Sequence, residues 1–254
     1  MSSIRPLVSV VTVVFNGEKY LEETIQSVIN QTYDNVEYTL IDGGSTDGTV
    51  DIIRKYEDKI AYWISEPDCG ISDAFNKGVL ASKGDYIYFL GADDYFLTND
   101  AIEKVMADID LESDDLVCGN VARVDMDGRE FAKTDVSSFK KRDLLFRMAL
   151  PHQGLFMHCR FFEKHGLFDI SNKFSMDYEL LLRAYHDFPK VVLKDIEVAA
   201  WRDGGCGTGR FLEIFAEYHQ NRVKNSVAPK FILDVIHLWT LFKFYIKKVI
   251  GKKI

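Results

Sequence analysis

The pattern of apolar and polar positions predicts alternating strands and helices over the first hundred residues. Residues 7–15 are an almost unbroken apolar run rich in valine, which is typical of a strand covered on both faces in a parallel sheet. Similar short runs follow at 36–41, 60–64 and 86–90. Between these runs, apolar residues recur every three or four positions, as they do on one face of a helix. Three helices are expected there. The first follows Asn16, which would cap it, the second begins at Asp47 or Thr49, and the third spans residues 72–81.

The pattern changes after about residue 115. Residues 116–124 and 129–133 flank an Asp-Gly pair, which is a strong signal for a β-hairpin. No linker rich in proline, glycine or serine divides the two halves, so the alternation predicts one α/β unit with a mainly parallel central sheet. The remaining elements expected are a helix near 140–148, a strand at 155–158 and a helix at 177–186.

Composition and charge exclude several broad classes of protein. A hydrophobic fraction of 47% and a charged fraction of 28% are ordinary for a globular chain and exclude general disorder or a fibrous repeat. The net charge of −8 argues against nucleic acid as the main partner. No segment resembles a signal peptide or a membrane span. The four cysteines show neither paired nor zinc-type spacing, which favours a reducing cytosol. They are Cys69, Cys118, Cys159 and Cys206.

The charge is distributed unevenly between the body and the C-terminal tail. Residues 229–254 contain six lysines and one acid, a net charge of +5, so the rest of the chain carries −13. Within the tail a narrow polar stripe runs beside a broad apolar face, which predicts an amphipathic helix with a lysine-rich end. Such a helix suits an anionic membrane surface. Packing on the domain or on a second subunit is the alternative.

Polar residues follow three of the predicted strands at the points where they end. Asn16, Asp42 and the pair Asp93-Asp94 hold these positions. Ligands of parallel α/β sheets bind outside the carboxyl ends of the strands. Adjacent carboxylates directly after a buried strand suit Mg²⁺ or Mn²⁺, although an acidic turn or helix start would look similar. The glycine-rich residues 42–49 are equally compatible with a plain turn between strand and helix.

Three further features carry weaker signals. Asp177 begins an amphipathic helix, where an aspartate is commonly only a cap. His152-Gln153 follows a proline and favours a structural histidine whose hydrogen bonds are satisfied. Residues 201–209 contain four glycines and suit either a mobile substrate lid or an ordinary surface turn.

Taken together, the motifs resemble inverting family 2 glycosyltransferases over residues 6 to about 208. The order and spacing of the motifs carry this resemblance. They are Val10–Asn16, the turn after Asp42, Asn76-Lys77-Gly78, Gly84–Tyr86, Asp93-Asp94, Gly166–Asp169 and Met176–Glu179. The absence of a Gln-x-x-Arg-Trp sequence favours addition of a single sugar, as in the bacterial enzymes of this type that build surface polysaccharides.

The resemblance implies a GT-A fold, an αβα sandwich that binds a nucleotide-sugar. The nucleotide-binding half would be residues 1–115, the acceptor half 116–208, and the C-terminal helical tail 209–254. Asp93 and Asp94 resemble the DxD element of the family, with Asp93 also near the ribose and either acid holding Mn²⁺ or Mg²⁺. Asp177 resembles the catalytic base. The other donor-binding residues implied are Phe15, Asn16, Asp42 and Lys77.

Three positions depart from the family pattern. Gly43 and Gly91 stand where many members carry an acid, and Met176 replaces the glutamate that precedes the base. The change at Gly43 puts one contact with the nucleobase in doubt. The change at Gly91 leaves Asp93 and Asp94 to share the work of the DxD element. The change at Met176 leaves Glu179 as a substitute for the missing glutamate.

The resemblance implies an inverting, metal-assisted transfer of one sugar from a nucleotide-sugar, with a UDP-sugar expected, to a hydroxyl of a glycan or polyprenyl-linked acceptor. It also implies a cytoplasmic enzyme held peripherally at the inner face of the cell membrane by residues 229–254. One alternative is a sugar-phosphate nucleotidyltransferase, but residues 15–18 lack the basic glycine-rich loop that grips a triphosphate. The other is a catalytically silent nucleotide-sugar-binding protein at the membrane.

Overall fold

A nine-stranded sheet organises the chain, and its strand order is β3-β2-β1-β4-β8-β6-β9-β5, with β7 paired to β6. The computed structural model describes residues 5–205 and 207–250, so Cys206, Lys252 and Lys253, which the sequence singled out, lie outside the described residues. The strands are β1 Val8–Val14, β2 Val36–Asp42, β3 Tyr62–Ser65, β4 Tyr86–Gly91, β5 Tyr95–Phe96, β6 Leu116–Val124, β7 Glu130–Lys133, β8 Leu155–His158 and β9 Val191–Arg202.

The helices alternate with these strands in the first half of the chain and cluster near its end. The α-helices are α1 Leu21–Ile29, α2 Thr49–Lys55, α3 Ile71–Ala81, α4 Ala101–Met106, α5 Cys159–His165, α6 Met176–Arg183, α7 Phe211–Lys224 and α8 Lys230–Val249. Short 3₁₀ turns are η1 Glu57–Lys59, η2 Lys141–Leu145, η3 His152–Gly154 and η4 Tyr185–Asp187.

The sheet is mixed. The pairs β3–β2, β2–β1 and β1–β4 are parallel, as the alternation of strands and helices predicted. Beyond β4 the pairs of β8 with β4 and β6, of β7 with β6 and of β5 with β9 are antiparallel, and only β6–β9 is parallel. The predicted parallel sheet therefore describes the N-terminal half, and the C-terminal half completes it with mainly antiparallel strands.

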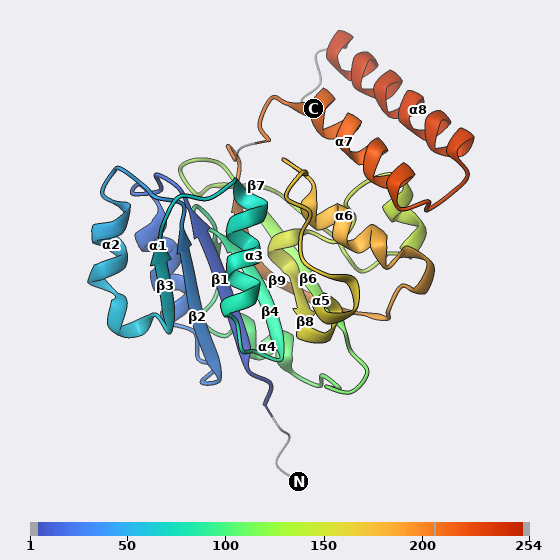
Figure 1. The fold of residues 1–254 in the computed structure, drawn as a ribbon. Coiled ribbons are helices and arrows are strands. Elements are labelled where there is room, and N and C mark those ends of the chain that lie inside the picture. The colour runs from blue at the N-terminus through green and yellow to red at the C-terminus, as the bar shows by residue number, and fades with distance from the viewer. Residues whose placement is uncertain (1–4, 206, 251–254) are drawn as a thin grey trace.

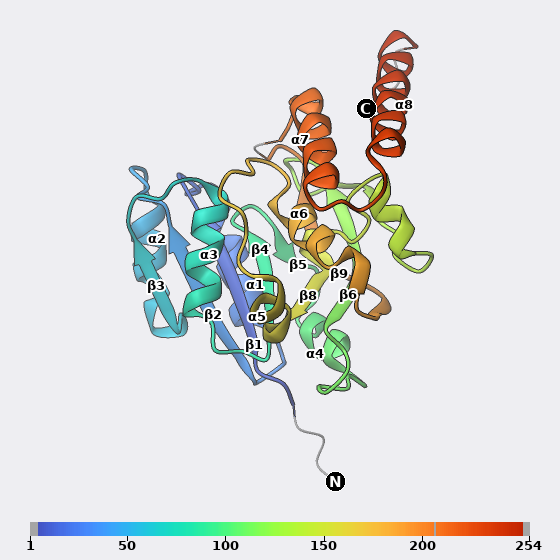
Figure 2. The same ribbon diagram turned by 45° about the vertical axis from the view of Figure 1, so that its right-hand side comes forward.

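Helices cover both faces of the sheet (Figures 1 and 2). Val10 and Val11 of β1 point to opposite faces because side chains alternate along a strand. On the Val10 face, α1, α2 and α4 contribute buried apolar residues to one core cluster. On the Val11 face, α3, α5 and α6 contribute to a second cluster. The three layers confirm an α/β sandwich with two separate cores.

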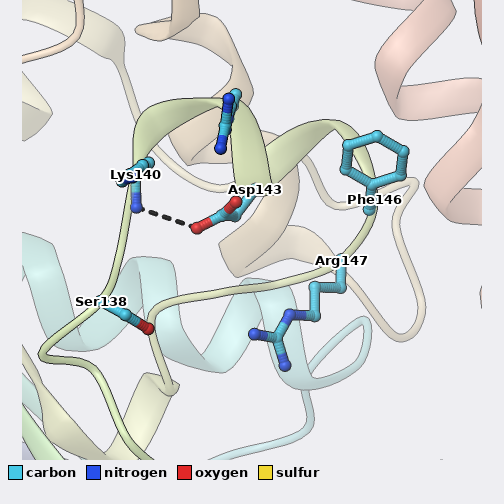
Figure 3. A pocket seen from close by; sticks show the side chains of 6 residues that line it. Ser138, Lys140, Asp143, Phe146 and Arg147 are labelled. Carbon is cyan, nitrogen blue, oxygen red and sulfur yellow. Dashed lines mark hydrogen bonds between the residues drawn. The ribbon is translucent and has the colours of Figure 1, made fainter.

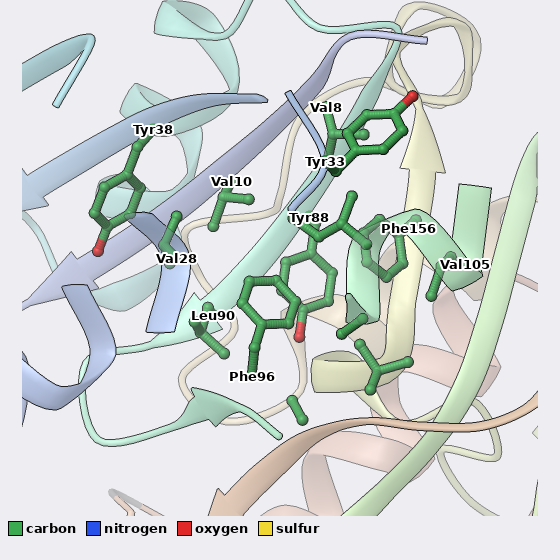
Figure 4. Close-up of a cluster of buried hydrophobic side chains, with 14 of the residues drawn as sticks. Val8, Val10, Val28, Tyr33, Tyr38, Tyr88, Leu90, Phe96, Val105 and Phe156 are labelled. Carbon is green, nitrogen blue, oxygen red and sulfur yellow. The ribbon is translucent and has the colours of Figure 1, made fainter. Parts of the chain in front are cut away.

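Stacked aromatic rings fill the first core where β4, β5 and β8 approach one another (Figure 4). The Tyr88 ring stacks on Phe156 at a centroid distance of 4.2 Å and on Phe96 at 5.0 Å. The Tyr88 hydroxyl still finds an acceptor, the Gln153 carbonyl oxygen at 2.6 Å. This core therefore reaches to the turn η3 and fixes its position against the sheet.

The glycine of the Asn76-Lys77-Gly78 motif allows α3 to lie close to β1. An added Cβ at Gly78 would overlap a methyl group of Val11. Any larger residue would push the helix off the sheet, since interiors leave no space for an extra methyl group.

The last two helices lie side by side at the end of the molecule opposite the N-terminus (Figures 1 and 2). α7 is tied to the body: Glu217 accepts hydrogen bonds from the backbone N–H groups of Lys173, Phe174 and Ser175, and Arg222 donates to the Leu145 carbonyl oxygen at 2.6 Å. α8 packs mainly on α7. None of the helices in the described residues is long and apolar enough to cross a membrane.

Two local expectations differ from the structure. The helix expected near 140–148 is only the short turn η2. Asn16 does not cap α1, which begins at Leu21 after Tyr20. Asn16 instead takes a positive φ of 52°, and its side-chain oxygen accepts a hydrogen bond from the Thr46 N–H at 2.9 Å. An asparagine tolerates this left-handed conformation better than most residues.

Candidate functional site

The polar residues predicted at the strand ends come together at one edge of the sheet. Asn16 joins the ends of β1 and β2 through Thr46 and through its own N–H, which donates to the Ser45 hydroxyl at 2.7 Å. Gly17 lies beside Ala92, whose side chain would be 3.7 Å from an added Cβ at Gly17. The loops after β1, β2 and β4 therefore form one contiguous surface.

Phe15 and Asp42 take different positions in this surface. Phe15 is 65% exposed, and its ring lies beside Gly43, where an added Cβ would be 3.5 Å from the ring and would overlap Asp68. Asp42 is fully buried, and its carboxylate accepts hydrogen bonds from the Ser45 and Ser65 hydroxyl groups, each at 2.5 Å. Phe15 therefore offers a free aromatic face, while Asp42 holds the turn that positions it.

Lys77 is engaged by the loop that follows β3. Its ammonium group lies 2.7 Å from a Glu66 carboxylate oxygen and 3.8 Å from Asp73. These acids raise the pKa of Lys77, so it stays charged. No contact between Lys77 and the acid pair appears among the described residues.

Asp93 and Asp94 lie at the carboxyl end of β4. Asp94 is buried, and its two oxygens accept from the Arg202 N–H at 2.9 Å and from the Gln153 side chain at 3.1 Å. Burial and the neighbouring charge of Asp93 raise the pKa of Asp94 to about 7. Burial also raises the pKa of Asp93. Two acids held this close resist being ionised together, so the site favours binding of a positive charge.

The geometry of the pair fits a divalent cation. An added Cβ at Gly91 would lie 2.7 Å from an oxygen of Asp94 and 3.1 Å from an oxygen of Asp93, so both carboxylates converge on the space beside Gly91. Two carboxylates with substrate phosphates are a common ligand set for Mg²⁺. The described residues contain no group of three or more metal-binding side chains, so further ligands would come from substrate or water.

Arg202 lies beside the acid pair. The sequence placed it only in the glycine-rich segment 201–209, expected to be a lid or a surface turn, whereas it is the last residue of β9 and is buried. Its guanidinium group is buried, donates to Glu23 at 2.7 Å and lies over the ring of Tyr20 at 4.3 Å. Its Nε also donates to the Asp93 carbonyl oxygen at 3.3 Å. The sequence signal for Arg202 was its position as an arginine at the end of an apolar run. Only the pairing of β9 with β5 shows that this arginine lies beside the end of β4.

Asp177 occupies the first turn of α6, which begins at Met176 after Ser175. Its carboxylate accepts from the Tyr178 N–H at 2.7 Å, and the side chain keeps 19% of its surface exposed. Burial is the main cause that raises the pKa of Asp177. Glu179, the expected substitute for the missing glutamate, is fully buried and paired with Arg183 and Lys224. Glu179 therefore supports α6 and does not face the site.

The turn η3 joins the acid pair to Asp177. Gln153 contacts Asp94, and the neighbouring His152 has its Nδ1 3.9 Å from an oxygen of Asp177. We expected His152 to be a structural histidine whose hydrogen bonds are satisfied. This expectation is wrong for the Nε2 atom, which is buried and has no hydrogen-bond partner. No local sequence pattern connects residues 152–153 with both acids.

A separate cavity of about 300 Å³ lies beside η2 and does not belong to this surface (Figure 3). Figure 3 shows Lys140 and Asp143 joined by a hydrogen bond, in which the Lys140 N–H donates at 2.9 Å. None of the residues predicted for the site lines this cavity. Its lining residues are Ser138, Lys140, Arg142, Asp143, Phe146 and Arg147.

Comparison with protein families gives one match. The family described as glycosyl transferase family 2 matches residues 9–169. This range contains the loops after β1, β2 and β4, including the acid pair, and it ends before Asp177.

Curated relatives are similar over most of the chain. An uncharacterized glycosyltransferase of Rickettsia typhi is 33% identical over 188 residues, which are 70% of this chain and 58% of that protein. An uncharacterized glycosyltransferase of Mycobacterium tuberculosis is 31% identical over 180 residues, 70% of this chain and 69% of that protein. A PGL/p-HBAD biosynthesis glycosyltransferase of Mycobacterium bovis is 29% identical over 206 residues, 79% of this chain and 78% of that protein. The matched part of the first of these is thus little more than half of its length.

Solved structures share the fold. S. aureus TarS 1–349 in complex with UDP-GlcNAc superposes with a TM-score of 0.71 at 18% identity, covering 91% of this chain and 70% of that one. The mannosyltransferase PcManGT from Pyrobaculum calidifontis, in complex with GDP-Man and Mn²⁺, superposes with a TM-score of 0.67 at 17% identity, covering 92% and 69%. Identities this low support the fold and not the ligands.

Proposed function

We propose that this chain, which belongs to glycosyl transferase family 2, transfers one sugar from a nucleotide-sugar to an acceptor hydroxyl group with inversion at the anomeric carbon. The observation that carries the proposal is that one turn, η3, contacts both the acid pair and Asp177. Asp94 of the acid pair and Asp177 both contact the turn η3, which supports a common site for the proposed donor acids and the proposed base.

The donor side of the proposed site is built from the loops after β1, β2 and β4. Phe15 provides an exposed ring for a nucleobase, and Asn16 and Asp42 hold the two loops that flank it. A uridine diphosphate sugar is the proposed donor, as the resemblance of the sequence motifs to family 2 glycosyltransferases implies. Lys77 belongs to the same edge, although its charge is shared with Glu66.

Asp93 and Asp94 would hold Mn²⁺ or Mg²⁺ beside Gly91. A divalent cation there would neutralise the charge that develops on the leaving diphosphate. The chain itself prepares the position: Arg202 and Gln153 fix the Asp94 carboxylate, and Arg202 also binds the Asp93 carbonyl oxygen.

Asp177 is the proposed general base for the acceptor hydroxyl. A base must reach the proton it removes and have a pKa suited to holding it. Asp177 keeps part of its surface open, and burial makes its carboxylate a better proton acceptor than an ordinary aspartate. Attack by the hydroxyl on the face opposite the diphosphate gives inversion without a covalent enzyme intermediate, as in the single-displacement logic of inverting glycosidases.

The acceptor proposed is a glycan or a polyprenyl-linked sugar at the inner face of the cell membrane. The structural support is α8, which leaves a row of large apolar side chains exposed, including Trp239 at 52% and Phe242 at 53%. The row shares one helix face and consists of Phe231, Val235, Leu238, Trp239, Phe242, Tyr245, Ile246 and Val249.

Charge favours a membrane over a second copy of the chain as the cover of this face. The lysines at 243, 247 and 248 rise from the same helix, and its only acid, Asp234, is already paired with Lys230. Two copies of α8 packed in parallel would bring lysine against lysine, whereas anionic headgroups would meet each lysine with about 1 kcal/mol of attraction. We therefore propose peripheral attachment through α8.

A donor screen tests the proposed function against its alternatives. Nucleotide-sugars, including UDP-GlcNAc and GDP-Man, are tested with Mn²⁺ for thermal stabilisation and then for release of nucleoside diphosphate. We expect one donor to stabilise the protein and to be turned over. A catalytically silent binding protein would be stabilised without turnover. A nucleotidyltransferase would instead release pyrophosphate from a nucleoside triphosphate and a sugar phosphate.

A further inference from the structure

The turn η3 contacts both halves of the proposed site with two adjacent side chains. Gln153 donates to Asp94 at 3.1 Å, and His152 lies 3.9 Å from Asp177. The turn is fixed from behind, because the Tyr88 hydroxyl donates to the Gln153 carbonyl oxygen and an added Cβ at Gly154 would overlap the Gly119 carbonyl oxygen. His152 therefore has a defined position relative to both acids.

The imidazole of His152 is largely covered, and its side chain keeps 16% of its surface exposed. Its ring stacks on Phe89 at a centroid distance of 5.4 Å and an interplanar angle of 19°, and it packs against Phe75 at 5.3 Å. The Nε2 atom is buried without a hydrogen-bond partner. An acceptor cannot reach that nitrogen, although the side chains of His152 and Asp177 are exposed to a similar extent, 16% and 19%. Of the two proposed catalytic features, the acid pair and Asp177, the one that the His152 ring contacts is Asp177.

The protonation state of His152 follows from this packing. Burial lowers the pKa of His152, so the ring is neutral near pH 7 and carries one N–H. A proton on Nδ1 faces the Asp177 carboxylate, and the bare Nε2 then lies in the apolar layer. The opposite tautomer would bury an unpaired N–H and turn a lone pair toward a negative charge, so both contacts disfavour it.

Other groups around Asp177 act in the opposite direction or through the backbone. Glu217 of α7 raises the pKa of Asp177 by its charge, while the Tyr178 N–H lowers it by a hydrogen bond. Burial, and after it the charge of Asp177, raises the pKa of the Tyr218 phenol on α7. His152 is the side chain that lowers the pKa of Asp177, by its charge when the ring is protonated. The neutral ring would act on the carboxylate through the dipole of its Nδ1–H.

We propose that His152 is a positioning residue, whose Nδ1–H orients the Asp177 carboxylate and which the turn η3 holds at a fixed place relative to Asp94. The inference rests on the proposed function of Asp177 as the base. It assigns His152 no contact with donor or acceptor. It also explains why His152 and Gln153 are neighbours, since one rigid turn then aligns the base with the donor acids.

Histidine NMR on the full-length protein tests the contact without any substrate. In ¹⁵N-histidine spectra we expect the His152 ring to be neutral with its proton on Nδ1, and we expect Asp177→Asn to lower the pKa of His152 by about one unit, because a neighbouring opposite charge has effects of this size. The His152 signal is assigned with His152→Asn. A proton on Nε2, or a titration unchanged in Asp177→Asn, overturns the proposal.

A pH profile separates positioning from simple packing. Nucleoside diphosphate release from UDP-GlcNAc with Mn²⁺ is measured for His152→Leu and His152→Asn. We expect the leucine variant to move the acidic limb of the profile to higher pH and the asparagine variant, which keeps a donor near the Nδ1 position, to restore it. His165→Leu is the matched control, because His165 also packs on a ring, that of Phe161 at 4.6 Å, away from the site.

The two experiments distinguish failure of the inference from failure of the proposed function. An equal loss of rate at every pH in His152→Leu, with no recovery in His152→Asn, overturns the positioning role. Absence of any turnover by the wild type instead counts against the proposed function, and the NMR titration still decides whether His152 and Asp177 are coupled. If His152→Leu does not fold, the Asp177→Asn titration decides the question by itself.

Discussion

The proposed donor-binding end of the site contains two carboxylates, Asp93 and Asp94, beside a glycine that has no side chain, Gly91. Asp93 and Asp94 converge on a space that a side chain at position 91 would fill. The sequence showed Gly91 only as a departure from the family pattern. In the structure the same glycine leaves the space in which the proposed cation would lie, so we expect the site of this chain to depend on its small size.

Gly91→Ala tests this view of the glycine. The added methyl group would lie 2.7 Å from an oxygen of Asp94, closer than real Cβ contacts, and would have to push the carboxylate aside. We expect the Mn²⁺ concentration for half-maximal turnover to rise about tenfold or more, since disturbing the support of metal ligands has effects of about 10- to 100-fold. Gly205→Ala is the control, because nothing lies within 4 Å of its added Cβ. Unchanged Mn²⁺ dependence in Gly91→Ala would refute the assignment.

Removal of the metal is the complementary prediction for the same acids. EDTA should abolish turnover, and added Mn²⁺ or Mg²⁺ should restore it, because the diphosphate leaves poorly without neutralisation of its charge. Asp93→Asn and Asp94→Asn should each impair donor turnover while far-UV circular dichroism shows an intact fold. Full activity in EDTA would show that Asp93 and Asp94 do not bind a catalytic cation.

α8 packs on α7 with a different face from the one that the amphipathic pattern of α8 suggests. Leu233, Ile236 and Phe244 are buried, yet the polar residues Asp234 and His237 also face α7. The broad apolar face points outward instead. The sequence predicted an amphipathic helix, but it could not show which face packs on the protein, because α7 offers His219 as a partner for the polar stripe.

A pair of stacked histidines makes this docking sensitive to pH. The rings of His219 and His237 stack at a centroid distance of 4.6 Å, and the Nδ1 atoms of both are buried without a hydrogen-bond partner. Burial lowers the pKa of each histidine, with Arg222 lowering both and Asp234 opposing the shift. Protonation is therefore easier when the helices separate. Docking is fully stable above the free histidine pKa of about 6.5 and weakens as the pH falls below it.

Hydrogen exchange of α8 measures this effect. We expect faster exchange at about pH 5.5 than at about pH 7.5 after correction for the intrinsic rate, because the free histidine pKa of about 6.5 lies between these two pH values. His237→Gln, which removes one of the two titrating rings, should reduce the difference. Equal protection at both pH values in the wild type would show that the histidine pair does not control docking.

The sequence predicts some elements of this fold better than others, for physical reasons. The strands β1, β2 and β4 are mostly buried and rich in apolar residues, so their ends could be found from the sequence. This placed Asn16, Asp42 and Asp94 at or directly after strand ends. β9 mixes Lys194, Asp195 and Glu197 with apolar residues, because part of it is only half-buried, and it gives no clear period. His152 and Arg202 reach the acids through pairings far apart in the chain, which no local pattern encodes.

Charge and exposed apolar surface divide the whole molecule into two regions. The body carries −13 and the segment 229–254 carries +5, so an anionic surface repels most of the molecule and attracts one end. That end also holds the exposed face of α8. An apolar face of this size is unusual on a protein that stays free of partners. Attachment through α8 would orient the body in the same way each time it binds.

Vesicle sedimentation tests attachment with the fold kept intact. The double variant Trp239→Glu and Phe242→Glu places charges on side chains that are about half exposed, so α8 should still pack on α7. We expect the wild type to sediment with phosphatidylglycerol vesicles at low salt and to be released by high salt, and the variant to remain free. Leu80→Glu is the control, because Leu80 is 73% exposed on α3. A wild type that ignores these vesicles would contradict the membrane proposal.

The separation of donor binding from chemistry in Asp177→Asn tests the central claim most directly. The substitution removes the proposed base but leaves Asp93, Asp94 and the donor loops unchanged. We expect kcat to fall by about 10²-fold or more, because a general base contributes about 10²- to 10⁴-fold, while calorimetry with the donor and Mn²⁺ gives an affinity close to that of the wild type. Wild-type turnover in Asp177→Asn, with donor binding intact, would contradict the assignment of Asp177 as the base.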